Sequence, residues 1–150
     1  MVNQITLNIL LADDDKDDRF FFEKALKVSS IPTHLITIED GEKLLIYLSK
    51  NSDRLPDVLF LDFNMPRKNG SECLQEIKNN QKLKHLPVII YSTYIHKDLA
   101  DLLYKNGAHG FIRKVNHEEL EKTLHHILSL LAEKKFVRPT RDQFTLNYPT

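Results

Sequence analysis

The sequence predicts an α/β fold, in which a parallel β-sheet is covered by helices on both faces. Five apolar segments with strand composition alternate with five segments of helical periodicity, which is the pattern of repeated βαβ units. Two of the apolar segments, "DVLFLD" (57–62) and "LPVIIYS" (86–92), are almost continuously apolar, as expected for strands buried on both faces. With 150 residues, 41 % of them hydrophobic, the chain suits one compact domain, which at this size buries roughly 70 % of its unfolded surface.

The predicted strands are short runs rich in Ile, Leu, Val and Phe. The first, "ITLNILLA", and the second, "THLITIE", are rich in Ile and Leu, whereas the fifth, "AHGFIRK", is shorter and weaker. The five strands are expected at residues 5–12, 33–39, 57–62, 86–92 and 108–114.

The predicted helices carry apolar residues at intervals of three and four positions. Asp15 is suited to cap the start of the first helix, and Gly107 is suited to end the fourth. The five helices are expected at residues 16–28, 41–50, 71–80, 97–107 and 117–135.

The last segment, 136–150, falls outside this alternation. Its two prolines disfavour a helix, and it is too short for a second domain. We therefore expect one domain over residues 1–135, followed by a C-terminal tail at 136–150 and no separate effector domain.

Composition excludes several classes of protein. The formal net charge of zero argues against nucleic-acid or membrane-surface binding. Cys73 is the only cysteine, so no disulfide framework exists and a reducing compartment is expected. The N-terminus lacks the pattern of a signal peptide, and no apolar run approaches the ~20 residues that span a membrane. We expect a cytoplasmic protein.

Polar side chains gather where the predicted strands end. In an open α/β sheet, ligands bind beyond the carboxyl ends of the strands. The residues at these ends are Asp13, Asp14, Asp62, Asn64, Ser92, Thr93 and Lys114. Three carboxylates, a hydroxyl and one ammonium would therefore meet at one edge.

Such a concentration of carboxylates requires a counterion, because like charges held close together repel one another. Magnesium suits the set, since it prefers a few carboxylates, a carbonyl and waters in an octahedron. A carboxylate beside the metal could act as a nucleophile toward a phosphoryl group, and Lys114 could pair with a phosphoryl oxygen. Asp17 and Asp18 are expected to be acids of the first helical turn without a part in the site.

The order and spacing of these residues resemble the receiver domain of two-component response regulators. The resemblance covers residues 7 to 134 and includes "ADDD" followed by Arg19, and "DFNMPRKNG" at 62–70. Ser92 occupies the position of the switch hydroxyl, Phe111 that of the switch aromatic residue, and Lys114 that of the family lysine. The fold implied is flavodoxin-like, a doubly wound five-stranded parallel sheet of order 2-1-3-4-5 with five helices.

The resemblance also implies the chemistry of the site. Asp62 would accept a phosphoryl group from the phosphohistidine of a histidine kinase or a histidine phosphotransfer protein. Asp14 and Asp62 would ligate Mg²⁺ together with the main-chain carbonyl of Asn64, and Asp13 would reach the metal through water. The chain would not be an enzyme, except in acquiring and losing its own phosphoryl group.

The remaining family positions concern binding and timing of the phosphoryl group. Ser92 and Lys114 would bind its oxygens, and Ser92 and Phe111 would form the switch. Asn64 and Tyr94 would border the approach of the hydrolytic water, with Thr93 next to Tyr94. The bulk of Thr93 and Tyr94 would slow phosphorylation from small donors and also dephosphorylation. The alternative is that Tyr94 points into solvent and has no effect on either rate.

Two departures from the family pattern resemble a subgroup of single-domain regulators, including those partnered with cyanobacterial phytochrome kinases. Val115 follows Lys114 where proline, often in a cis bond, is usual, and Thr93 replaces a smaller residue. Output would be onward phosphotransfer or a protein contact. Such a contact, with a downstream protein or a second copy, is expected on the face of the fourth helix, fifth strand and last helix. Tyr104 and Leu130 are expected to be exposed on that face.

Two other functions remain as alternatives. The first is a magnesium-dependent phosphatase with an aspartyl nucleophile, but Asn64 stands where such an enzyme needs an acid for the leaving group. The second is a receiver-like binding module that is never phosphorylated, against which the complete acidic set and Lys114 argue.

Overall fold

The computed structural model describes residues 5–147. Residues 1–4 of the predicted domain and residues 148–150 of the predicted tail lie outside the described residues. A five-stranded parallel sheet has the order β2-β1-β3-β4-β5, as the sequence predicts. The elements along the chain are β1 (Leu7–Ala12), α1 (Lys16–Val28), β2 (Thr33–Ile38), α2 (Gly41–Lys50), β3 (Val58–Leu61), α3 (Gly70–Asn79), β4 (Val88–Ser92), α4 (Lys97–Lys105), β5 (Gly110–Arg113) and α5 (His117–Ala132).

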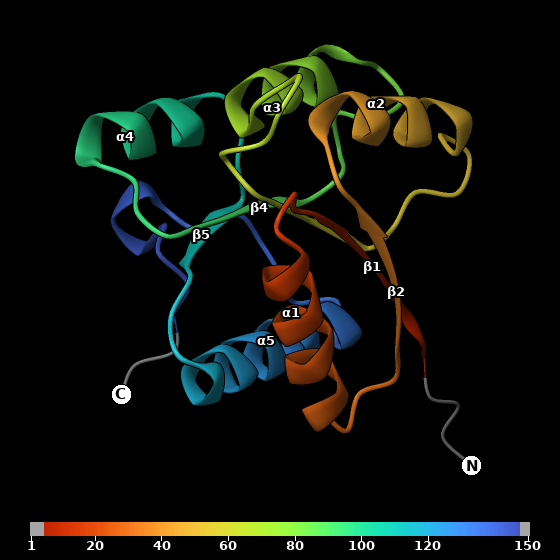
Figure 1. Ribbon diagram of the computed structural model, residues 1–150, viewed down its shortest axis with the longest axis vertical. Helices are drawn as coiled ribbons and strands as arrows, with labels where there is room; N and C mark the ends of the chain where they lie inside the picture. Colours follow the sequence, from red (N-terminus) through yellow and green to blue (C-terminus); the bar gives the residue numbers. More distant parts are fainter. Residues whose placement is uncertain (1–4, 148–150) are drawn as a thin grey trace.

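The helices form a layer on each side of the sheet. Figure 1 shows α2, α3 and α4 above the sheet and α1 and α5 below it. Strands β3 and β4 are buried along their whole length, which explains their continuous apolar composition. On the α1–α5 side, the Phe22 ring packs edge-on against Phe60 at 5.0 Å and against Tyr91 at 5.5 Å between ring centroids.

Helices α4 and α5 end two and three residues earlier than the sequence predicts, because their last turns close in Schellman-type caps. Gly107 has a φ of 100° and ends α4, as expected from the sequence, while the Ala108 amide donates to the Leu103 carbonyl. Helix α5 stops at Ala132 and not at 135, because Lys134 adopts a φ of 58°. The next amide then reaches back to the Leu130 carbonyl.

The loop that follows β3 is closed tightly onto the start of α3. The Gly70 amide donates to the Phe63 carbonyl, and a Cβ on Gly70 would lie 2.8 Å from the Phe63 Cα. A capping box between Asn69 and Glu72 then begins α3. The segment that carries Asp62 is therefore fixed at both ends.

The tail folds back onto the edge of the sheet, a contact that the sequence did not predict. After a single 3₁₀ turn (Arg141–Gln143) it runs parallel to β5, and Thr145 pairs with Phe111. The Phe111 amide donates to the Phe144 carbonyl and the Leu146 amide donates to the Phe111 carbonyl, each at 2.8 Å. The described part of the tail thus extends the sheet beyond β5.

The same tail packs against α4. The Phe144 side chain is 1 % exposed and its ring meets Tyr104 edge-on at 5.6 Å. The Tyr104 hydroxyl donates to the Pro139 carbonyl, and the Arg138 guanidinium lies over the Tyr104 ring at 3.8 Å. The expectation that Tyr104 is exposed is therefore wrong, because the tail occupies its surface, and Leu130 is likewise half-buried.

Candidate functional site

The strand register brings the predicted residues to one edge of the sheet. Ala12 pairs with Leu61 at the ends of β1 and β3, so the next residues, Asp13 and Asp62, leave the sheet side by side. On the other side, the Lys114 amide donates to the Ser92 carbonyl at 2.8 Å and holds the ends of β4 and β5 together. The backbone of the sheet thus positions the acids, the hydroxyl and the ammonium.

Three carboxylates form a cluster at this edge. Asp13, Asp14 and Asp62 each offer an oxygen atom, and these atoms lie within 4.8 Å of one another. Asp13 and Asp62 are buried, whereas Asp14 is exposed, so the cluster is open toward solvent on one side. Hard oxygen donors with an open side fit a divalent cation that retains part of its water shell.

Asn64 lies at the rim of this cluster. Its side chain is exposed, and its backbone amide donates weakly to Asp62 Oδ1 at 3.4 Å. The Asp15 amide donates to Asp13 Oδ1 at 2.9 Å, and the Arg19 guanidinium donates to the Asp13 carbonyl at 2.8 Å. These two contacts fix the Asp13 side chain and the Asp13 carbonyl at the start of the loop after β1.

Lys114 is surrounded by three carboxylates. Its Nζ lies 2.8 Å from Asp18 Oδ2, 3.0 Å from Asp13 Oδ2 and 3.5 Å from Asp62 Oδ2. The expectation that Asp18 is only an acid of the first helical turn is therefore wrong. Its side chain accepts a hydrogen bond from the Lys114 ammonium, which lies 96 residues further along the chain. The exposed Asp17 keeps the role that the sequence predicts.

Burial dominates the ionisation of the site. It raises the pKa of Asp62 to about 7, and the neighbouring Asp13 charge adds to this, while the Lys114 charge opposes it. Burial likewise raises the pKa of Asp13. Burial alone would lower the pKa of Lys114, but hydrogen bonds to Asp18 and Asp13 and the nearby carboxylate charges outweigh it and raise that pKa. An added cation would therefore favour the ionised form of both aspartates.

Ser92 has an unpaired hydroxyl beside these charges. Its residue is 1 % exposed, and its Oγ has no hydrogen-bond partner among residues 5–147. A buried polar group without a partner costs roughly 1–3 kcal/mol, so it marks a place where a ligand atom can bind. This hydroxyl and the Lys114 ammonium come from residues at the ends of β4 and β5, and the ammonium also contacts the first turn of α1.

The other predicted positions surround the site less closely. Thr93 is exposed, and Tyr94 is 72 % exposed, so the Tyr94 ring extends into solvent. Phe111 is buried in the same apolar cluster as Phe144. No cis peptide bond occurs within the described range, so the bond between Lys114 and Val115 is trans.

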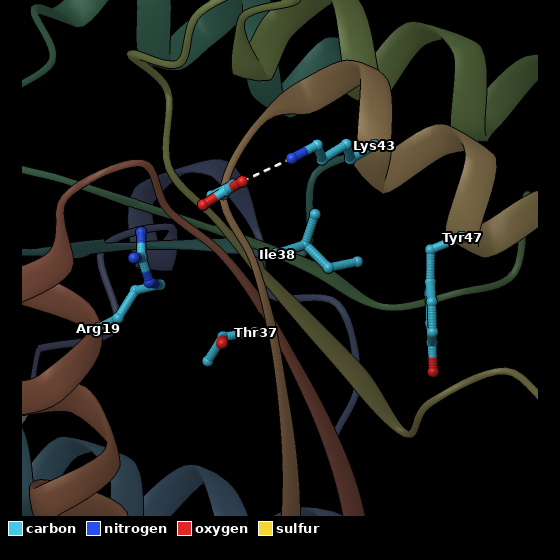
Figure 2. A pocket seen from close by; sticks show the side chains of 6 residues that line it. Arg19, Thr37, Ile38, Lys43 and Tyr47 are labelled. Carbon is cyan, nitrogen blue, oxygen red and sulfur yellow. Dashed lines mark hydrogen bonds and ion pairs between the residues drawn. The ribbon is translucent and has the colours of Figure 1, made fainter.

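A surface hollow lies next to the site but does not belong to it. It is lined by Arg19, Thr37, Ile38, Glu39, Lys43 and Tyr47. Figure 2 shows Lys43 reaching across to Glu39 from α2, with Arg19 entering from α1 on the other side. These charged groups already have protein partners, because Lys43 pairs with Glu39 and Arg19 holds the Asp13 carbonyl.

Known proteins share both the sequence pattern and the fold. The response regulator receiver domain family matches residues 9–125. The response regulator Rcp1 of Synechocystis sp. is 34 % identical over 131 residues, which cover 83 % of this chain and 88 % of Rcp1.

No helix within the described residues is long and apolar enough to cross a membrane.

Solved structures of two related regulators superpose on the whole domain. The Mn(2+)-bound form of Rcp1 has a TM-score of 0.75 at 31 % identity and covers 89 % of this chain and 99 % of its own. The phosphorylated cyanobacterial phytochrome response regulator RcpA has a TM-score of 0.77 at 30 % identity, with 87 % and 96 % covered. The predicted resemblance to regulators of this subgroup is thereby confirmed, and the chain belongs to the response regulator receiver family of two-component signalling.

Proposed function

We propose that the chain is a phosphorylation switch, in which Asp62 accepts a phosphoryl group from the phosphohistidine of a histidine kinase or histidine phosphotransfer protein, with Mg²⁺ bound. One observation carries this proposal. The buried Asp62 carboxylate lies in a cluster with two further carboxylates, the Lys114 ammonium is 3.5 Å from it, and β4, the strand next to β3, ends at Ser92, whose buried hydroxyl has no partner within residues 5–147. Nucleophile, metal ligands and oxygen-binding groups thus converge on one point.

The metal site would use the acidic cluster. Asp14 and Asp62 would ligate Mg²⁺ directly with the main-chain carbonyl of Asn64, and Asp13 would act through a water. When bound, the ion supplies positive charge that keeps Asp62 ionised and offsets the charge of the phosphoryl oxygens. The related Rcp1 has an Mn(2+)-bound form, which together with the acidic cluster of this chain supports the binding of a divalent cation.

The protein's own groups account for the transfer. An Asp62 oxygen attacks phosphorus, the bond from phosphorus to the histidine nitrogen breaks, and that nitrogen keeps the electron pair. Lys114 would hold one phosphoryl oxygen by charge, and Ser92 would donate its free hydroxyl to another. The phosphorylated form of the related RcpA supports this chemistry for the family.

The output would be a change in protein contacts. A phosphoryl group adds about −1.5 to −2 charges, and its capture by Ser92 would free space into which Phe111 can turn. The α4–β5–α5 face would then bind a downstream protein or a second copy of the chain. Because the tail covers Tyr104 on this face, we include residues 136–147 in the surface that responds.

Neither alternative function gains support from the site. Asn64 is an exposed amide, which cannot protonate the leaving group of a small phosphoester. A binding module without phosphorylation would leave the buried Ser92 hydroxyl unpaired without a purpose.

The experiment is mass spectrometry of intact protein after incubation with a small acyl phosphate and Mg²⁺. Wild type and Asp17→Asn should gain one phosphoryl group, whereas Asp62→Asn, which keeps the shape but lacks the nucleophile, should gain none. Asp17 is a matched control because it is an exposed acid near the same edge. An adduct of equal yield on Asp62→Asn would refute the assignment.

A further inference from the structure

The nearest carboxylate to Lys114 does not belong to the acidic cluster. Asp18 Oδ2 lies 2.8 Å from the ammonium, nearer than Asp13 at 3.0 Å and Asp62 at 3.5 Å. The Asp18 side chain is 35 % exposed, whereas those of Asp13 and Asp62 are almost wholly buried. The ammonium is therefore drawn toward α1 and away from the nucleophile.

The position of Asp18 is set by the start of α1. The Asp18 amide donates to the N-cap Asp15 at 3.0 Å, so its backbone is fixed in the first turn. Its side chain reaches the ammonium that follows β5, which also lies 5.0 Å from the Tyr91 ring centroid. The Lys114 side chain is 12 % exposed, so it has little freedom to exchange these partners for water.

An ammonium has three donors, and they are directed by the acceptors around it. Asp18 and Asp13 take the two short contacts, so Asp62 is left with the long one. A phosphoryl oxygen on Asp62 would need one of these donors. The third donor is the one that faces Asp62, and to shorten that contact the ammonium must move toward Asp62 and thus away from Asp18, its partner on α1.

We propose that Asp18 is a positioning residue that holds the Lys114 ammonium toward α1 and competes for it with the phosphoryl group on Asp62. The inference rests on the proposed phosphorylation of Asp62. Asp18 thereby sets how strongly the site retains its phosphoryl group.

Asp18→Asn keeps the size of the side chain and removes its charge. The variant should bind beryllofluoride, a phosphoryl analogue, about 5-fold more tightly in the presence of Mg²⁺, as expected for release of a partly exposed ion pair beside an anion. Asp17→Asn removes the same charge one residue away, without a contact to Lys114, and should change the affinity less than 2-fold. Affinity and dissociation rate are measured by ¹⁹F NMR of bound beryllofluoride.

A double-mutant cycle tests whether the effect acts through the lysine. In a Lys114→Gln background, which weakens binding overall, Asp18→Asn should leave the affinity unchanged within 2-fold. An equal gain with and without Lys114, or an equal gain in Asp17→Asn, would overturn the positioning role and leave the proposed function intact. If wild type bound no beryllofluoride with Mg²⁺, the proposed function would fail and the inference with it.

Discussion

Phe144 is the one fully buried side chain within tail residues 136–147, so replacing it by alanine should release the tail from β5. Phe144 is 1 % exposed and packs between α4 and the sheet edge. A cavity that persisted after Phe→Ala would cost about 3–5 kcal/mol, whereas burying such a side chain contributes roughly 1.5–3 kcal/mol. A terminal segment can detach and does not have to keep the cavity. We therefore expect a loss of about 1–3 kcal/mol in the free energy of unfolding.

Hydrogen exchange of single amides gives the local readout. The Phe111 amide donates to the Phe144 carbonyl, and the Leu146 amide donates to the Phe111 carbonyl. Both amides should lose protection in Phe144→Ala, while amides in β3 should keep theirs. Val137→Ala is a suitable control, because Val137 lies in the same tail and is 76 % exposed.

Gly110→Ala should weaken the same contact between the tail and β5 through a change in the strand. A Cβ on Gly110 would lie 2.3 Å from Leu146 Cδ1, so the Leu146 side chain would have to move. The same two amides should then exchange faster. If the Phe111 amide kept its protection in both variants while stability fell by more than 3 kcal/mol, the reasoning that the tail peels off would be refuted.

Three further predictions concern the acidic site. Because burial raises the pKa of Asp62 to about 7, the folded protein keeps a proton that the unfolded chain releases above about pH 4. The free energy of unfolding of the metal-free protein should therefore fall by about 1–3 kcal/mol between pH 4 and 7. Urea unfolding in EDTA should show a weaker pH dependence for Asp62→Asn than for wild type, and an equal pH dependence would contradict this. Magnesium titration by calorimetry should show a larger loss of affinity for Asp14→Ala than for Asp17→Ala, and equal losses would mean that the wrong acids were assigned to the pocket. Thr93→Ala should hasten decay of the phosphorylated protein several-fold, whereas Tyr94→Ala, which removes a ring that is 72 % exposed, should leave it unchanged; unchanged decay in Thr93→Ala would exclude gating by that side chain.

The pattern of strands and helices was sufficient to predict a parallel sheet and the residues that meet at its carboxyl edge, whereas the strand order came from the resemblance to the receiver family. Parallel strands all end at the same edge, so Asp13, Asp62 and Lys114 had to converge there once the strands were recognised. The prediction of the residues at this edge depends only on where each strand ends, and the apolar pattern of the strands indicates those ends.

Asp18 and the tail could not be predicted in the same way. In the sequence, Asp17 and Asp18 are equivalent acids of a first helical turn, and only the arrival of Lys114 from β5 distinguishes them. The tail pairs with β5 through backbone groups, which leave no side-chain pattern to recognise. A signal did exist in Phe144, a large apolar residue that directly follows the stretch RPTRDQ at 138–143, and such a residue indicates a buried anchor.

The tail also changes how the edge of the sheet can meet another chain. An uncovered edge strand offers unpaired backbone groups, and a foreign strand can add to it with little regard for its sequence. At β5, the Phe111 amide and carbonyl are already paired within the chain, and Asn147 exchanges hydrogen bonds with the Arg113 backbone. Association by strand addition is thus blocked at this edge while the tail is in place. A partner must therefore recognise side chains here, which makes the contact selective.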